Sequence, residues 1–249
     1  MSTRLACVVF DADRPRSVAG FWAELLGWQV AVDRPDEVDI AANDPDGLEI
    51  ALTFLPAEHA KRGKNRIHLD LASRSLDHQC VQVDRALALG ARPIDIGQGA
   101  VPWVVLADPE GNEFCVLEPR EQYVDTGAIA AIVVDTTDPL RLAAFWSAAS
   151  GWPLGYDTAE VAGLRSATGL GSWLEFVRTG ESKSGRNRLR LDLTSFPADD
   201  PALEVERLRA AGAIPLAAGS LGAAPGLPLA DPETNEFCLL RPAPHFSTV

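Results

Sequence analysis

Apolar and polar positions along this chain follow two different periods, and the same order of periods occurs twice. Residues 5–10 and 129–134 are continuous apolar runs with several β-branched side chains, which is typical of buried strands. The first run is followed by apolar residues at helical spacing, with Val18, Phe21 and Leu25 on one face. The pattern therefore predicts a strand and then a helix near the start of each half.

Capping residues and glycines set the expected limits of these helices. A short polar side chain just before a proline favours a helix start, and a glycine favours a helix end. The predicted starts are Asp13 with Pro15 and Thr137 with Pro139, and the predicted ends are Gly27 and Gly151.

Later in the first half the period changes from helical spacing to strict alternation. Residues 65–71 alternate as in a strand with one buried face. Ile67, Leu69 and Leu71 point one way, and Arg66, His68 and Asp70 point the other. A second helix is predicted over residues 76–89 and its copy over 201–211, and strands 103–106 and 113–117 are joined by the turn 108–112.

The two halves repeat in sequence as well as in pattern. Residues 107–115 return as 230–238 with eight identities in nine, at an offset of 123 positions. The Phe-Trp pair at 21–22 returns at 145–146, and residues 65–71 return at 187–193, at offsets of 124 and 122. Nearly constant offsets indicate duplicated folding units. We therefore expect a domain at 1–119, a linker at 120–127, a second domain at 128–242 and a loose tail at 243–249. Each domain reads as two βαβββ-like modules.

The order of these motifs resembles the vicinal oxygen chelate (VOC) superfamily, in its glyoxalase-like and bleomycin-resistance-like branch. The motifs are Phe-Trp before Leu-Gly-Trp or Ser-Gly-Trp, Asn-Arg-x-His-Leu-Asp-Leu, and Asp-Pro-Glu-Gly-Asn-Glu-Phe-Cys. The resemblance covers almost the whole chain. It implies an α+β fold of two tandem domains, each made of paired βαβββ modules with a curved mixed sheet enclosing a cleft. It does not imply one activity, because this fold carries isomerases, dioxygenases, thiol transferases and drug-sequestering proteins.

The resemblance also implies where a metal would be held, on the first and fourth strands of one module and their counterparts in the next. In domain one these positions suggest His68, Cys115 and Glu49. In domain two they fall on Glu175 and Cys238, but Arg190 places a permanent positive charge where the cation would lie. No cofactor is expected, and a divalent metal in domain one stays open. His68 also fits a hydrogen-bonded core residue, and both cysteines fit small buried hydrophobes.

Two clefts of different character are expected from the two copies. Domain one would line its cleft with Arg66, His68, Asp70, Trp103, Cys115 and Leu117. Domain two would present Trp173, Glu175, Arg188, Arg190 and Cys238. Within each strand, Arg66 and Arg188 are expected to pair with Asp70 and Asp192. Because an aromatic wall with few polar groups is how small-molecule sites are usually built, domain one is the better candidate pocket.

These features leave three functional hypotheses. The first is a protein that binds a small apolar or aromatic metabolite, such as a natural product, without metal. The second is an enzyme of lyase, isomerase or dioxygenase type using a metal on His68, or a metal-free cyclase or hydrolase using His68 and Asp70 as acid and base. The third is an assembly subunit with vestigial clefts.

Composition narrows the choice of partners and compartment. The net charge of −13 repels phosphate backbones, so nucleic acid is not an expected partner. No apolar run approaches the roughly 20 residues of a membrane span, and the start of the chain does not read as a signal peptide. The four cysteines show no CxxC spacing. A cytoplasmic monomer or homodimer that binds a small molecule is expected.

Overall fold

Four βαβββ modules build the protein in a computed structural model, which describes residues 3–43, 49–222 and 226–241. The predicted tail at 243–249 lies outside the described residues. The first module contains β1 (Thr3–Ala12), α1 (Pro15–Leu26), β2 (Gln29–Arg34), β3 (Glu37–Ala41) and β4 (Ala51–Pro56). The second contains β5 (Ile67–Leu71), α2 (Leu76–Ala88), β6 (Arg92–Pro93), β7 (Val104–Ala107) and β8 (Glu113–Val116).

The second half repeats this order after a short linker. The linker contains one turn of 3-10 helix, η1 (Glu121–Tyr123). The third module contains β9 (Ile129–Thr136), α3 (Pro139–Ser150), β10 (Leu154–Asp157), β11 (Val161–Leu164) and β12 (Trp173–Arg178). The fourth contains β13 (Leu189–Ser195), α4 (Pro201–Ala211), β14 (Ile214–Pro215), β15 (Leu227–Ala230) and β16 (Glu236–Leu240).

The modules form two mixed sheets of eight strands, which confirms the predicted fold class. Sheet A has the order β14-β15-β16-β13-β1-β4-β3-β2, and sheet B has the order β10-β11-β12-β9-β5-β8-β7-β6. Each sheet therefore joins one module from each half of the chain. Antiparallel pairing of β1 with β13 and of β5 with β9 makes the central contact of each sheet.

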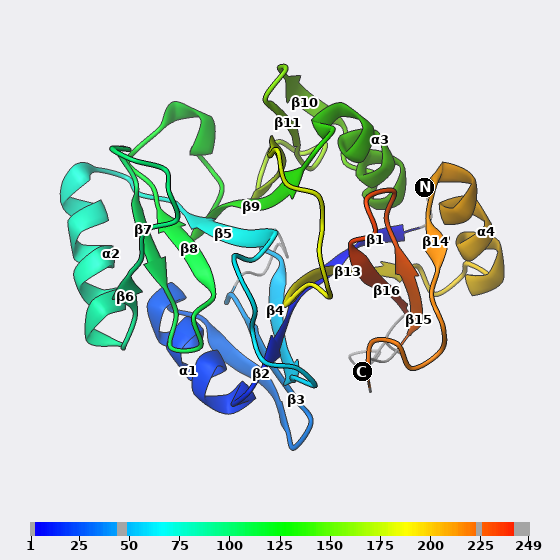
Figure 1. Cartoon of the computed structure of the whole chain (residues 1–249), viewed down its shortest axis with the longest axis horizontal. Coiled ribbons are helices and arrows are strands. Elements are labelled where there is room, and N and C mark those ends of the chain that lie inside the picture. Colours follow the sequence, from blue (N-terminus) through cyan, green and yellow to red (C-terminus); the bar gives the residue numbers. More distant parts are fainter. Residues whose placement is uncertain (1–2, 44–48, 223–225, 242–249) are drawn as a thin grey trace, which may run out of the picture.

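Helices cover the outer faces of both sheets. Figure 1 shows α1 and α2 on one side of the molecule and α3 and α4 on the other, with the strands between them. One contiguous apolar core lies under these helices and includes side chains from all four modules. Alternation in β5 places Ile67, Leu69 and Leu71 in this core, as predicted, and turns His68 and Asp70 to the opposite, inner face.

The two modules of one half belong to different sheets but are locked together by aromatic packing. The Trp22 ring of α1 lies 5.0 Å from the Phe114 ring of β8, and Trp22 Nε1 donates to Asp108 at 3.2 Å. In the second half, Trp146 makes the same contacts with Phe237 and Asp231. The repeated Phe-Trp pairs and the repeated turns are thus structural.

The helix ends and the starting prolines Pro15 and Pro139 agree with the prediction, but the capping residues differ from it. Gly27 and Gly151 end α1 and α3 in the left-handed conformation, with φ of 71° and 78°. The cap positions are Arg14 and Asp138, one residue later than the predicted Asp13 and Thr137. Among the helices of the described residues, none is both long and apolar enough to span a bilayer.

Candidate functional site

The inner face of sheet B carries a compact group of three polar side chains. His68 and Asp70 come from β5, and Cys115 comes from the neighbouring β8, where it lies opposite Asp70. One ligand atom from each residue lies within 4.8 Å of the other two. All three residues are buried, so the group lies on the floor of this face.

Burial controls the protonation of the group. It lowers the pKa of His68 to about 4, with help from the nearby Lys64 charge, so this imidazole is neutral at pH 7. It raises the pKa of Asp70 to about 7, and the Glu175 charge acts in the same direction. It also raises the pKa of the Cys115 thiol. Near neutral pH the group therefore contains a neutral base, a partly protonated carboxyl and a thiol.

Two atoms of this group lack ordinary partners. His68 Nε2 and Asp70 Oδ1 are 3.5 Å apart, at the limit of a hydrogen bond. His68 Nδ1 and Asp70 Oδ1 are buried without a hydrogen-bond partner among the described residues. A buried polar atom without a partner is costly, which makes these two atoms candidates for contact with a bound group.

Glu175 lies on the same face but is engaged by the linker. It projects from β12, which pairs with β9 and through it with β5. The Tyr123 hydroxyl donates to its carboxylate at 3.1 Å, and Gln122 Nε2 donates at 3.1 Å. Burial raises the pKa of Glu175, and the surrounding donors oppose that rise.

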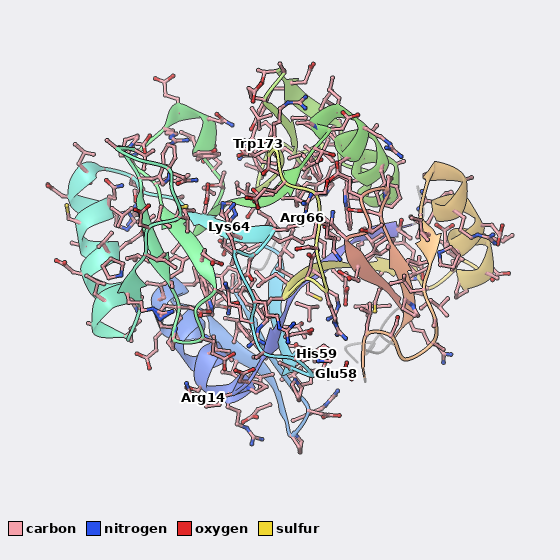
Figure 2. All side chains as sticks on the ribbon, in the orientation of Figure 1. Arg14, Glu58, His59, Lys64, Arg66 and Trp173 are labelled. Atoms are coloured by element: carbon pink, nitrogen blue, oxygen red, sulfur yellow. The ribbon has the colours of Figure 1, made fainter. Side chains whose placement is uncertain are left out.

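Two half-buried tryptophans form apolar walls beside this floor. Trp103 and Trp173 pack against a small inner cluster that contains Cys115, Leu117 and Tyr123. Each tryptophan ring faces a guanidinium group, because Arg120 lies 5.3 Å from the Trp103 ring and Arg165 lies 5.2 Å from the Trp173 ring. Figure 2 shows Trp173 in the upper part of the view, above Lys64.

Sheet A carries the equivalent positions with a different charge pattern. Arg190, Asp192 and Cys238 stand where sheet B has His68, Asp70 and Cys115. Arg190 Nε donates to Asp192 at 3.1 Å, and Arg190 Nη1 donates to Asp11 at 3.1 Å. Burial alone would lower the pKa of Arg190, but the two carboxylates raise it, so this guanidinium stays charged. The Arg190 side chain therefore places a permanent positive charge on this face of sheet A.

The structure corrects the predicted division of the clefts. The sequence predicts Trp173 and Glu175 in a domain-two cleft, but they lie on the inner face of sheet B with His68. The reason is the pairing of modules across the two halves. Likewise, Arg190 and Cys238 share their face with Asp11 of the first half.

Glu49 does not join the His68 group. It lies just before β4 in sheet A, where its carboxylate accepts from the Ala128 backbone nitrogen at 2.6 Å. Asp70 is the third side chain of the group instead.

Arg66 and Arg188 do not pair with Asp70 and Asp192. Arg66 Nη2 lies 2.8 Å from Glu233, and Arg188 Nη2 lies 3.0 Å from Glu110. The side chains of both arginines are largely buried, and each also donates to a backbone carbonyl outside the turn, Arg66 to Asp135 at 2.7 Å and Arg188 to His59 at 2.8 Å. Figure 2 shows Arg66 near the centre of the molecule, between the two sheets.

Four residues of the site are absent from the sequence prediction: three belong to the linker, and the fourth is Tyr156 of β10, whose ring lies 5.1 Å from the Trp173 ring. Tyr123 and Gln122 reach Glu175, and Arg120 lies over Trp103. A signal for them is Tyr123 within a mostly polar linker, since a buried aromatic residue there must pack against a neighbouring face.

Comparison with known proteins agrees with this architecture. A family described as Glyoxalase-like domain matches residues 7–117 and 131–240. No curated protein matches the sequence.

The structure of glyoxalase I from Zea mays is similar with a TM-score of 0.68 and 15% identity, over 96% of this chain and 92% of that one. A protein from Bacillus subtilis subsp. subtilis str. 168, described as a candidate dioxygenase, is similar with a TM-score of 0.64 and 14% identity, over 99% and 87%. At these identities the structural likeness shows the fold alone. Since the family match covers both halves, the chain belongs to the glyoxalase-like domain family, as a tandem member of the VOC fold.

Proposed function

We propose that this protein binds a small molecule with an apolar or aromatic body on the inner face of sheet B, without requiring a metal. The observation that carries the proposal is the buried polar floor of His68, Asp70 and Cys115 beside two half-buried tryptophans. Small-molecule sites combine apolar walls with a few polar groups that fix orientation. The glyoxalase-like fold is compatible with such a role.

The free polar atoms indicate what the ligand presents to the floor. His68 Nδ1 and Asp70 Oδ1 are unpartnered among the described residues, whereas Glu175 already accepts from Tyr123 and Gln122. A neutral imidazole accepts one hydrogen bond, and a protonated carboxyl donates one. A hydroxyl group on an otherwise apolar ligand would satisfy both, because it donates to the imidazole nitrogen and accepts from the protonated carboxyl.

A second candidate function is supported by the same group. A histidine nitrogen, a carboxylate oxygen and a thiolate sulfur within 4.8 Å suit a first-row divalent cation, and three protein ligands leave positions open. Burial has left His68 Nδ1 and Asp70 Oδ1 unpartnered, so the donor set fits a cation. A bound cation would polarise a substrate oxygen, and His68, Asp70 and Cys115 would hold it. The protein would then be an enzyme of lyase, isomerase or dioxygenase type.

The charge balance of the two sheets favours sheet B over sheet A for any cation. In sheet A, the Arg190 guanidinium pairs with Asp11 and Asp192, and Arg186 pairs with Asp11 as well, so two cations balance the two carboxylates. In sheet B, the equivalent residue is the neutral His68, and Asp70 faces the additional acid Glu175. Without a cation, protonation of Asp70 removes its negative charge, which is otherwise unbalanced beside Glu175. The same proton makes His68 and Asp70 a base and an acid for metal-free catalysis.

Ligand titration tests the leading proposal. Tryptophan fluorescence is measured against a panel of aromatic and apolar metabolites, and isothermal titration calorimetry follows each compound that quenches. Saturable binding of at least one compound class supports the proposal. Uniform silence across the panel, for protein that is folded by circular dichroism, contradicts it.

Elemental analysis separates the two candidates. The protein is purified without a histidine tag and reconstituted with divalent metals, beside a His68→Ala variant. The leading proposal predicts metal well below stoichiometric in both samples. About one equivalent in the wild type, lost in His68→Ala, would establish the second candidate instead. If turnover is detected and survives in His68→Ala, both enzyme mechanisms that use His68, the metal-dependent and the metal-free one, are ruled out.

A further inference from the structure

The two sheets contain the same aspartate once with a cation and once without it. Asp70 of β5 and Asp192 of β13 are equivalent, since each lies beside the cysteine of the neighbouring strand. On sheet A, Arg190 Nε donates to Asp192 Oδ1 at 3.1 Å. On sheet B, the residue in the place of Arg190 is His68, and the strand registers are the same. Asp70 therefore has, among the described residues, no counterpart of that guanidinium.

Asp70 is also less covered than its copy. The Asp192 side chain is 2% exposed beneath Arg190, whereas the Asp70 side chain is 13% exposed. Asp70 Oδ1 is buried and has no hydrogen-bond partner within the described part of the chain, and His68 Nε2 stays 3.5 Å away from it. The shorter histidine thus leaves both an acceptor and part of the carboxyl surface for a ligand.

The cations near the sheet B floor do not replace the missing one. Two of them act on Asp70 from nearby, and each is already paired with an acid of its own. The pairs are Lys64 with Asp135 and Arg120 with Glu118. Glu175, a second acid of this face, accepts from the neutral side chains of Tyr123 and Gln122. Because the paired charges cancel, an ionised Asp70 leaves the floor with more negative than positive charge.

We propose that the sheet B site takes an organic cation, in which an amidinium, guanidinium or primary ammonium group is attached to an apolar or aromatic body. Its nitrogen would occupy beside Asp70 the place that the Arg190 guanidinium occupies beside Asp192. Such a group donates to a carboxylate and keeps further N–H donors for a neutral imidazole, so Asp70 Oδ1 and His68 Nδ1 both gain a partner. The tryptophan walls contact the body. This inference rests on the proposed function for the site, and it adds the chemical class of the ligand.

Benzamidine and benzamide test the proposal because they have nearly the same shape and differ in charge. Each is titrated into the wild-type protein by isothermal titration calorimetry at pH 8, above the pKa of Asp70. EDTA is present throughout, so that a divalent metal does not contribute to the binding. The wild type should bind benzamidine at least about tenfold more tightly than benzamide.

Three variants locate the bound cation. Asp70→Asn removes the charge of the acceptor and should weaken benzamidine binding at least about tenfold. His68→Arg supplies a guanidinium from the chain itself, as on sheet A, and should abolish benzamidine binding. Asp39→Asn is the matched control, because Asp39 lies on the inner face of sheet A and its Oδ1 is also buried without a partner among the described residues. This variant should bind benzamidine as the wild type does. If His68→Arg does not fold by circular dichroism, Asp70→Asn decides alone.

The contradictory results are specific. No benzamidine binding, equal affinity for benzamidine and benzamide, or benzamidine binding that survives in Asp70→Asn would each overturn the inference. A loss confined to Asp39→Asn would also overturn it, since the cation would then lie on sheet A.

The Trp103→Leu variant separates this inference from the proposed function. If neutral panel compounds bind and depend on Trp103 while benzamidine does not bind, the organic cation is wrong and the proposed function stands. If benzamidine binding needs Asp70 but not Trp103, the cation site stands and the proposed aromatic wall is wrong.

Discussion

Asp70 and Asp192 occupy equivalent positions on the inner faces of the two sheets, and their neighbours give them different roles. Asp192 accepts from Arg190 Nε at 3.1 Å and from the Cys238 backbone nitrogen at 2.8 Å. Asp70 instead lies beside a neutral histidine, and its Oδ1 has no hydrogen-bond partner among the described residues. One aspartate is part of an ion pair, and the other is available for a proton, a ligand or a cation.

Replacing each aspartate with asparagine should separate these roles at pH 7. Asp192→Asn leaves a buried guanidinium short of a partner, which costs about 3 kcal/mol of unfolding free energy. Asp70→Asn replaces a carboxyl that is already partly neutral, so we expect a loss below about 1 kcal/mol. Urea denaturation of both variants measures the difference. Equal losses would contradict the charge assignment of the two faces.

The pH dependence of stability should also carry the signature of Asp70. Its folded pKa of about 7 is raised, so the protonated form contributes stability that is fully present below its unfolded pKa and is lost as pH rises through 7. His68 acts in the opposite direction, because its lowered pKa contributes stability that is lost as pH falls from about 6.5 through about 4.

Comparing the wild type with Asp70→Asn separates the contribution of Asp70 to the pH dependence of stability from that of His68. The unfolding free energy of the wild type, minus that of the variant, should fall between pH 4 and pH 7, by up to about 4 kcal/mol. Denaturation series at half-unit pH steps measure it. A difference that does not vary with pH would show that the Asp70 pKa is not raised.

At the scale of elements, two glutamates join the sheets to each other. Glu110, in the turn between β7 and β8, accepts from the backbone nitrogens of Asp13 and Arg14 at the start of α1, and it pairs with Arg188 of the other half. Glu233 does the same at the start of α3 and pairs with Arg66. Each glutamate is therefore a helix cap supplied from another module.

Removing either carboxylate should destabilise the protein measurably. Glu110→Gln and Glu233→Gln should each cost about 3 kcal/mol, because each leaves a buried arginine and a helix start without its anion. Glu206→Gln is the control, since Glu206 pairs with Arg209 on the exposed face of α4 and should cost at most about 0.5 kcal/mol. Thermal or urea unfolding gives the comparison. A small effect at Glu110 with a large one at Glu206 would contradict this view of the turns.

Local elements follow from the sequence because their signals are local. Gly27 ends α1 in the left-handed conformation, and the alternation in β5 separates the core residues from His68 and Asp70. The caps at Glu110 and Glu233 were not predictable, because each is separated from its helix start by more than 90 residues.

Which residues meet in the site depends on which strands pair, and the repeated sequence does not determine this pairing. Since both halves carry nearly the same strand edges, the sequence does not say whether β5 pairs with a strand of its own half or of the other. That choice moved Glu175 and Trp173 to the His68 face. The same pairing between halves brings Tyr123 and Arg120 to the site, since the linker that carries them passes beside sheet B.

At the scale of the molecule, the chain behaves as two halves that share both sheets. β1 pairs with β13 and β5 pairs with β9, so each half contributes one module to each sheet. Separate expression of residues 1–119 and 128–249 should therefore yield no folded monomer of either half. Coexpressed halves should copurify as a complex, as measured by light scattering and circular dichroism. Two independently folded monomers would contradict the shared sheets.

If the ligand binds on the inner face of sheet B, its affinity should depend on a tryptophan of that face. Isothermal titration of the tightest-binding panel compound against the wild type, Trp103→Leu and Trp152→Leu tests this. Trp103 forms a wall of that face, whereas Trp152 is a half-buried tryptophan in a cavity beside Arg4 and Glu49. We expect at least about tenfold weaker binding for Trp103→Leu and no change for Trp152→Leu. Unchanged binding in Trp103→Leu, or a loss confined to Trp152→Leu, would place the ligand elsewhere.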